Sequence, residues 1–199
     1  MAVSLQMSLS TTTSALQAIR NYCPRPIVAI ELRQAAVLVP IHECASGLGV
    51  TLIERAATLR SHGGEIGFPG GSVTAEDQDA LAAALREFQE EMGIAPENAE
   101  IIGQLDQVTV GGRYVVTPFV GMVKLPLNAR PNTDEVSSVI CVPVSALLEP
   151  GCFTVELRTA GGGPRTIYHF RYEALDIWGA TARILKQFLE LTYGFQPQG

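Results

Sequence analysis

Three glutamates stand close together in one short stretch of the sequence, Glu87, Glu90 and Glu91. On a helix, residues at i, i+3 and i+4 share one face, where three like charges repel one another. Arg86 can reach Glu90 across one helical turn and neutralise part of this charge. The remaining negative charge suits a hard divalent cation, which takes several oxygen ligands that include carboxylates. A run of charges is more often a solvated face of a surface helix, so the spacing alone leaves both interpretations open.

A glycine-rich segment, Phe68-Pro69-Gly70-Gly71, precedes this stretch by a short loop. Glycine has no Cβ atom, so the backbone can approach a bound ion or phosphate closely. A glycine pair by itself is weak evidence, because many tight turns contain one. Together, the glycine-rich loop and the carboxylate helix indicate a frame for a metal-bridged diphosphate.

Residues 86–94 read Arg-Glu-Phe-Gln-Glu-Glu-Met-Gly-Ile and resemble the end of the Nudix box, Arg-Glu-apolar-x-Glu-Glu-x-Gly-apolar. That box usually opens with Gly, five residues, Glu and a further seven residues before the arginine. Here 14 residues separate Gly71 from Arg86, one more than this pattern allows, and the acid nearest the expected Glu is Asp77. The longer spacing is typical of one subgroup, the coenzyme A pyrophosphatases.

A second pattern of that subgroup, Leu-Leu-Thr-x-Arg-(Ser/Ala)-x3-Arg-x3-Gly-x3-Phe-Pro-Gly-Gly, lies just upstream of the box. The chain matches it at Arg55, Ala56, Arg60, Gly64, Phe68, Pro69, Gly70 and Gly71. It departs at residues 51–53, where Thr-Leu-Ile replaces Leu-Leu-Thr, and we expect this change to affect strand packing more than chemistry. Further resemblance lies at residues 117–121, 132–136 and 178–182, so the similarity runs from roughly residue 35 to residue 190.

The resemblance implies an α/β (α+β) fold, the Nudix α/β/α sandwich, in which a mixed β-sheet lies between helices. It also implies metal-dependent hydrolysis of a diphosphate linkage, with coenzyme A or a derivative as the substrate, giving phosphopantetheine and adenosine 3′,5′-bisphosphate. Members of the family bind divalent metal through the box glutamates. Glu87 and Glu91 are therefore the expected core ligands of Mg²⁺ or Mn²⁺, Glu90 is expected to assist, and Arg86 is expected to orient the carboxylates.

Substrate contacts are expected from the upstream pattern, because arginine binds phosphate through bidentate hydrogen bonds. The alternative for each arginine is a surface salt bridge. The expected substrate-binding residues are Arg55, Arg60, Phe68, Gly70 and Gly71. Some Nudix enzymes use an acid outside the box as the general base, which makes Glu135 a candidate catalytic residue; otherwise it is a loop carboxylate.

Two other functions remain open at this point. The chain could hydrolyse a different nucleoside diphosphate derivative such as ADP-ribose, or it could be a non-catalytic module that senses a nucleotide. Loss of box glutamates would favour the sensing module, and all three glutamates are present. Homodimers are common in the family, so a homodimer is a further expectation that the sequence does not decide.

The predicted elements must position these residues. Apolar spacing from residue 79 to 92 predicts a helix with Leu81, Leu85, Phe88 and Met92 on one stripe, ended by Gly93. Residues 60–77 read as irregular, with a helix before them at 14–22 and a last helix at 178–192. Strands are predicted at 35–41, 50–53, 104–110, 114–123, 137–142, 153–157 and 166–172, with Gly47 and Gly49 marking the first turn. Only one long helix lies between strands, so the order of elements argues against a doubly wound βαβ array.

Composition and charge narrow the function classes. The chain has 199 residues and a net charge of −6, which suits a single globular domain at 14–199 behind a disordered tail at 1–13. No basic face is present, which argues against a nucleic-acid partner. No apolar run reaches about 18 residues, so no membrane partner is expected. The four cysteines lack zinc-site spacing and no secretory signal is recognisable, which favours thiols in a reducing cytoplasm.

Overall fold

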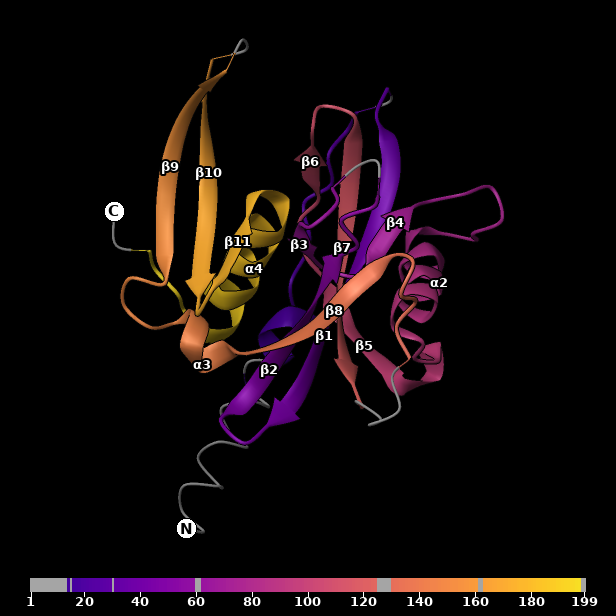
Figure 1. Ribbon diagram of the computed structural model, residues 1–199, viewed down its shortest axis with the longest axis horizontal. Helices are drawn as coiled ribbons and strands as arrows, with labels where there is room; N and C mark the ends of the chain where they lie inside the picture. Colours follow the sequence, from indigo (N-terminus) through magenta and orange to yellow (C-terminus); the bar gives the residue numbers. More distant parts are fainter. Residues whose placement is uncertain are drawn as a thin grey trace.

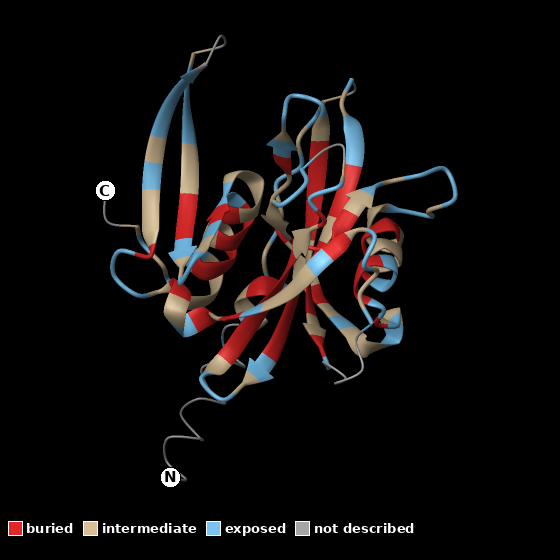
Figure 2. Cartoon of the chain, in the orientation of Figure 1, coloured by how far each residue is buried: buried red, intermediate tan, exposed pale blue. Residues whose placement is uncertain are grey.

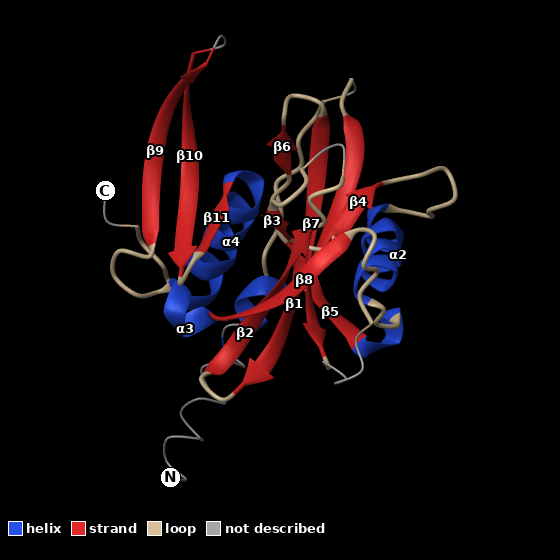
Figure 3. Ribbon diagram, in the orientation of Figure 1, coloured by secondary structure: helices blue, strands red, loops and turns tan. Residues whose placement is uncertain are grey.

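The structure, a computed structural model, describes residues 14, 16–29, 31–59, 62–124, 130–160 and 163–197. The predicted tail at 1–13 lies outside these ranges. The described strands (Figure 3) are β1 (Arg33–Cys44), β2 (Gly47–Arg55), β3 (Ile66–Gly67), β4 (Gly70–Ser72), β5 (Ala99–Gln104), β6 (Val108–Val110), β7 (Tyr114–Val123), β8 (Val136–Pro143), β9 (Phe153–Ala160), β10 (Gly163–Tyr172) and β11 (Leu175–Trp178). The described helices are α2 (Ala80–Met92), the 3-10 helix η1 (Pro96–Asn98), α3 (Val144–Leu147) and α4 (Gly179–Tyr193), and residues 16–20 are also helical.

A large mixed sheet forms the centre of the described chain. Its strand order is β3-β2-β1-β7-β5, with β4 paired to β1, β6 to β7 and β8 to β2. The β1–β7 pair is parallel and the other pairs are antiparallel, so the predicted mixed sheet is confirmed. A second sheet of three strands has the order β11-β10-β9.

Strand β1 is buried on both faces, which explains why it reads as one continuous apolar run. On one face, Leu38 packs with Phe88 and Met92 of α2. On the other face, Val39 belongs to the same cluster as Phe188 of α4. The buried band along the centre of the sheet therefore faces a helix on either side (Figure 2).

The layers run from α2 through the large sheet to α4 and then to the three-stranded sheet (Figure 1). The α/β/α sandwich is thus confirmed, and the small sheet adds an outer layer against α4. A glycine with positive φ ends each long helix, Gly93 after α2 and Gly194 after α4, as the sequence predicts for both.

Several predicted boundaries were wrong. Gly49 does not mark a turn, because it lies within β2 opposite His42 of β1, and only Gly47 adjoins the turn. The predicted strand at 104–110 is interrupted, since β5 ends at Gln104 and β6 begins at Val108. The segment 60–77, predicted to be irregular, contains β3 and β4. These strands have two and three residues, too few for a periodic pattern to reveal them.

Among the described residues, none of the helices has the length and apolar character that crossing a membrane requires.

Candidate active site

Helix α2 presents its three glutamates at three different depths. Asp79 caps its first turn by accepting a hydrogen bond from the Ala82 N–H at 2.8 Å. The side chain of Glu91 is only 2% exposed, whereas those of Glu87 and Glu90 are 18% and 54% exposed. The helix therefore offers one buried, one partly buried and one solvent-facing carboxylate along the same edge.

The buried carboxylate of Glu91 is bound from two sides. Arg55 Nη1 donates to Glu91 Oε1 at 2.9 Å, and the Gly70 N–H donates to Oε2 at 2.8 Å. Arg55 Nη2 also donates to the Gly70 carbonyl at 3.0 Å, which closes a ring of three groups. Burial raises the pKa of Glu91 to about 7, even though Arg55 and the Gly70 N–H both favour the charged form.

The two glycines of the loop lie where no side chain would fit. Gly70 has a φ of 154°, and a Cβ atom there would overlap the Ala36 carbonyl and the backbone of Val37 in β1. A Cβ atom at Gly71 would overlap the carboxylate of Glu87. The loop can therefore fit between β1 and α2 only because both positions lack a side chain.

Arg86 joins the other two carboxylates to the loop before the helix. Its Nε and Nη2 donate to Asp77 at 3.0 and 3.1 Å, a bidentate pair. Its Nη1 donates to Glu87 at 2.9 Å and to Glu90 at 3.1 Å. Asp77 also accepts from the Thr74 N–H at 2.8 Å, and these contacts hold the pKa of Asp77 well below its usual range. The predicted reach from Arg86 to Glu90 is confirmed.

The donor set fits a divalent cation. Three carboxylates line one edge of α2, and the missing Cβ of Gly71 leaves backbone next to Glu87. In the described ranges, no three His, Cys, Asp or Glu side chains come together as a closed group of metal ligands. The carboxylates instead accept from Arg55 and Arg86, which offset only part of their negative charge. Mg²⁺ needs few protein ligands, because waters and substrate phosphates complete its octahedral shell.

Two further segments meet the same site. The Asn132 N–H donates to the Glu91 carbonyl at 3.1 Å, and the Ala56 N–H donates to the Glu135 carbonyl at 2.8 Å. The hydroxyl of Thr181, in the first turn of α4, donates to the Ile66 carbonyl at 3.3 Å, just before the glycine loop. The site is therefore assembled from four parts of the chain that lie far apart in sequence.

Comparison with known proteins agrees with this geometry. The family model described as "NUDIX domain" matches residues 32–158. A protein of Citrobacter koseri named "Uncharacterized Nudix hydrolase NudL" is 40% identical over 166 residues, covering 83% of this chain and 85% of that protein. A protein of the same name from Salmonella paratyphi B is 39% identical over 165 residues, with the same shares covered. The chain belongs to the Nudix family.

Solved structures are more distant. A MutT/nudix family protein from Enterococcus faecalis has a TM-score of 0.49 and 19% identity, covering 80% of this chain and 54% of that chain. The Caenorhabditis elegans Ap4A hydrolase has a TM-score of 0.48 and 21% identity, covering 57% and 82%. The assignment therefore rests on the sequence matches. As a Nudix hydrolase, the protein is a pyrophosphohydrolase of a nucleoside diphosphate derivative, in a family that uses divalent metal ions.

The predicted substrate-binding residues of this Nudix enzyme do not all face solvent. Gly70 and Gly71 line the carboxylates, and the guanidinium of Arg55 is bonded to Glu91 and Gly70. Phe68 is 3% exposed and belongs to the hydrophobic core, so its ring anchors the glycine loop and does not face solvent. Arg60 lies outside the described residues. A contact of any of them with substrate stays a prediction.

Sequence reasoning left one partnership undecided and missed another. The sequence places Asp77 only as the acid nearest the expected glutamate of the box, whereas in the structure it is the bidentate partner of Arg86. The hydrogen bond between Arg55 and Glu91 joins the upstream pattern to the box, a contact that the sequence does not predict. No signal in the sequence could have indicated this contact, because 36 residues separate Arg55 from Glu91 and residue types do not reveal burial.

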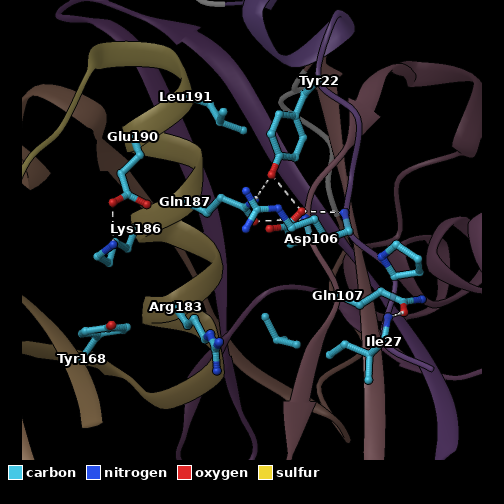
Figure 4. Close-up of a pocket in the computed structure, with 13 residues that line it drawn as sticks. Tyr22, Ile27, Asp106, Gln107, Tyr168, Arg183, Lys186, Gln187, Glu190 and Leu191 are labelled. Atoms are coloured by element: carbon cyan, nitrogen blue, oxygen red, sulfur yellow. Dashed lines mark hydrogen bonds and ion pairs between the residues drawn. The ribbon is translucent and has the colours of Figure 1, made fainter. Parts of the chain in front are cut away.

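A cavity of about 610 Å³ lies on the α4 side of the molecule, away from the box glutamates. Three of its lining residues are bound to one another: Tyr22 donates to Asp106 at 2.8 Å, and Gln187 donates to the Tyr22 hydroxyl at 3.1 Å (Figure 4). Arg183 and Lys186 of α4 also line it. The hydrogen bonds tie the N-terminal segment to α4 and to the break between β5 and β6.

Proposed function

We propose that this Nudix hydrolase cuts the diphosphate linkage of coenzyme A or one of its derivatives, giving phosphopantetheine and adenosine 3′,5′-bisphosphate. One observation carries the proposal: segments that resemble the coenzyme A pyrophosphatases meet around one carboxylate. Arg55 and Gly70 of the upstream pattern bind the side chain of Glu91, and Asn132 binds its backbone carbonyl. Thr181 holds the α4 segment against the same loop.

In this proposal Glu87, Glu90 and Glu91 hold a divalent cation, Mg²⁺ or Mn²⁺. When bound, such an ion polarises the phosphoryl oxygens and lowers the pKa of its water ligand. Arg55 and the Gly70 N–H fix the orientation of the Glu91 carboxylate. Arg86 does the same for Glu87 and Glu90, and both carboxylates are therefore preorganised before substrate arrives.

Glu135 is the proposed general base. Its backbone lies beside Ala56, next to the arginine that binds Glu91. Its side chain is half-buried, and in this proposal its carboxylate accepts a proton from the attacking water. The water would attack one phosphorus, and the leaving phosphate would take the oxygen that bridged the two phosphates.

The test is a substrate panel assayed with Mg²⁺ and with Mn²⁺, in which the products are identified by mass. Parallel incubations with a chelator are the metal-free control. Coenzyme A differs from ADP-ribose by its 3′-phosphate and pantetheine arm, and we propose that Arg60 binds that phosphate. A charge-assisted contact contributes roughly 1.5–3 kcal/mol, about ten- to a hundredfold in kcat/KM. Coenzyme A should therefore be cut faster than 3′-dephospho-coenzyme A and ADP-ribose.

Arg60→Ala should narrow that preference, while Arg171→Ala on the exposed face of β10 serves as the matched control. ADP-ribose as the best substrate would overturn the coenzyme A assignment and leave hydrolysis of another nucleoside diphosphate derivative. No turnover of any diphosphate with either metal would favour the nucleotide-sensing module. Equal losses on all three substrates in Arg60→Ala would assign Arg60 to the shared diphosphate or the loop.

A further inference from the structure

The cavity beside α4 has an excess of cationic side chains in a protein whose net charge is −6. Arg25, Arg183 and Lys186 line it together with two acids, Asp106 and Glu190. Arg25 belongs to the segment before β1, Asp106 to the break between β5 and β6, and the other three to α4 (Figure 4). A hollow with more cations than acids attracts anionic ligands, even where the whole protein is acidic.

Both acids of the lining hold the frame of the cavity together. Asp106 Oδ1 accepts a hydrogen bond from the Tyr22 hydroxyl at 2.8 Å and another from the Arg25 N–H at 2.7 Å. Glu190 accepts from the Lys186 ammonium at 2.5 Å, one helical turn away on α4. The charges of Lys186 and Glu190 therefore balance each other. The excess of positive charge then lies with the two arginines.

The guanidinium groups of Arg25 and Arg183 are suited to an anion. Both residues are exposed, and the Arg183 side chain extends from α4 into the space between the helix and Gln107 (Figure 4). The ion pairs formed by the described residues include Lys186 with Glu190 but neither Arg25 nor Arg183. A guanidinium donates two parallel hydrogen bonds to a phosphate, a geometry that an ammonium lacks. Two guanidiniums in one cavity therefore favour a phosphate group over a singly charged ligand.

The rest of the lining suits a small organic group attached to that phosphate. The cavity volume of about 610 Å³ lies within the range of small-molecule sites, roughly 300–1,000 Å³. Gln187 is fixed by the Asp106 N–H and the Tyr22 hydroxyl, and Gln107 is fixed by the Ile27 N–H, so these walls are preorganised. Apolar or aromatic surface comes from the side chains of Pro26, Ile27, Val108, Tyr168 and Leu191.

We propose that this cavity is a second binding site, for a small phosphomonoester whose phosphate is held by Arg25 and Arg183. The cavity lies on the α4 side of the large sheet, whereas the box glutamates belong to α2 on the opposite face (Figure 1). The phosphate is bound by guanidinium groups, so binding at this site requires no divalent cation. A phosphomonoester has no diphosphate linkage, and the bound molecule is not cut.

Titration calorimetry in the presence of chelator tests the proposal, with adenosine 5′-monophosphate as the phosphomonoester and adenosine as its phosphate-free counterpart. Wild type should bind the monophosphate at one site per chain, and adenosine at least ~10-fold more weakly, because charge-assisted contacts to the phosphate are lost. Arg183→Ala and Arg25→Ala should each raise the Kd of the monophosphate at least ~10-fold for the same reason. Arg171→Ala, exposed on β10 and outside the cavity lining, should leave the Kd unchanged.

Glu91→Gln separates this cavity from the carboxylate edge of α2. In chelator it should bind the monophosphate with wild-type affinity, because the cavity does not include the box. The circular dichroism of both arginine variants should match wild type, since the two residues are exposed. No binding to wild type at the highest attainable concentration would overturn the proposal. So would adenosine or succinate binding as tightly as the monophosphate, unchanged affinity in both arginine variants, or loss of binding in Glu91→Gln.

Discussion

Asp77 and Glu91 have similar partners and opposite behaviour. Each accepts hydrogen bonds from an arginine and from a backbone N–H, and the two side chains are 4% and 2% exposed. Yet the pKa of Asp77 is held well below its usual range, whereas burial raises the pKa of Glu91 to about 7. The same kind of pairing therefore gives opposite proton affinities in two regions of one site.

Depth explains the difference. Asp77 is covered by Arg86 and its own loop, in which Thr74 and Glu76 are exposed, so water lies just beyond a thin shell. Glu91 stands beside Phe88 and Met92, which are fully buried. Desolvation penalises the charged form more strongly the deeper the group lies, and only there does it exceed the attraction of the arginine. Small exposed area is thus a poor guide to depth.

Removing the deep arginine should have the largest effect. Arg55→Ala leaves the Glu91 carboxylate buried without its charged partner, which costs about 3–5 kcal/mol of unfolding free energy at pH 8. Urea unfolding measures this loss. The double variant Arg55→Ala/Glu91→Gln should recover part of it, because no charge is then left buried. If the free energy of unfolding of Arg55→Ala equals that of wild type within error, Arg55 and Glu91 do not form a buried ion pair.

Neutralising the buried carboxylate of Glu91 should have the second-largest effect. Glu91→Gln is nearly isosteric, so it keeps the fold, but it should lower kcat at least ~10²-fold through loss of a main electrostatic element. Steady-state kinetics under saturating metal measure the change. Glu97→Gln, an exposed acid outside the box, is the matched control. Near wild-type kcat in Glu91→Gln would remove Glu91 from the catalytic ligands.

The opposite pKa directions predict opposite pH dependence in the metal-free protein. Because the folded pKa of Glu91 is raised, the folded state binds more protons between about pH 4.5 and 7. The contribution of Glu91 to the free energy of unfolding is fully present below pH 4.5 and is lost as pH rises through about 7. The loss between pH 5 and pH 7 is about 2 kcal/mol. Asp77 acts in reverse, since its contribution is present above its ordinary value of 3.8 and is lost in acid.

Urea unfolding of wild type and Glu91→Gln at pH 5 and pH 7 separates the two carboxylates. The variant should lack the loss of stability between these values, while its stability at more acidic pH should still fall as Asp77 gains a proton. An identical pH profile in both proteins would show that the raised pKa of Glu91 is wrong.

Loosening the shallow network should have the smallest effect. Asp77→Asn removes one half of the bidentate anchor of Arg86, which then orients Glu87 and Glu90 less strictly. A change in a residue that positions metal ligands typically lowers metal affinity at least about tenfold. Titration calorimetry with Mn²⁺ measures the affinity, and Glu76→Gln on the same loop is the control. If Asp77→Asn lowers the Mn²⁺ affinity as much as Glu91→Gln does in the same titration, Asp77 belongs among the metal ligands.

The sequence alone determined much of this protein. Continuous apolar runs indicated β1 and β2, because strands covered on both faces need no alternation. The spacing of Arg86, Glu87, Glu90 and Glu91 indicated a shared helical edge, since helical geometry fixes it locally. Gly93 correctly predicted the end of α2, because helices commonly end at a left-handed residue and glycine adopts that conformation without strain.

Tertiary structure decided the rest. Residues 36 apart in sequence, Arg55 and Glu91, meet only because β2 and α2 flank the glycine loop. The short strands β3 and β4 exist through pairing with distant strands and carry no periodic signal of their own. The difference in depth between Asp77 and Glu91 likewise cannot be read from residue types, because desolvation depends on the packed surroundings that the fold alone supplies.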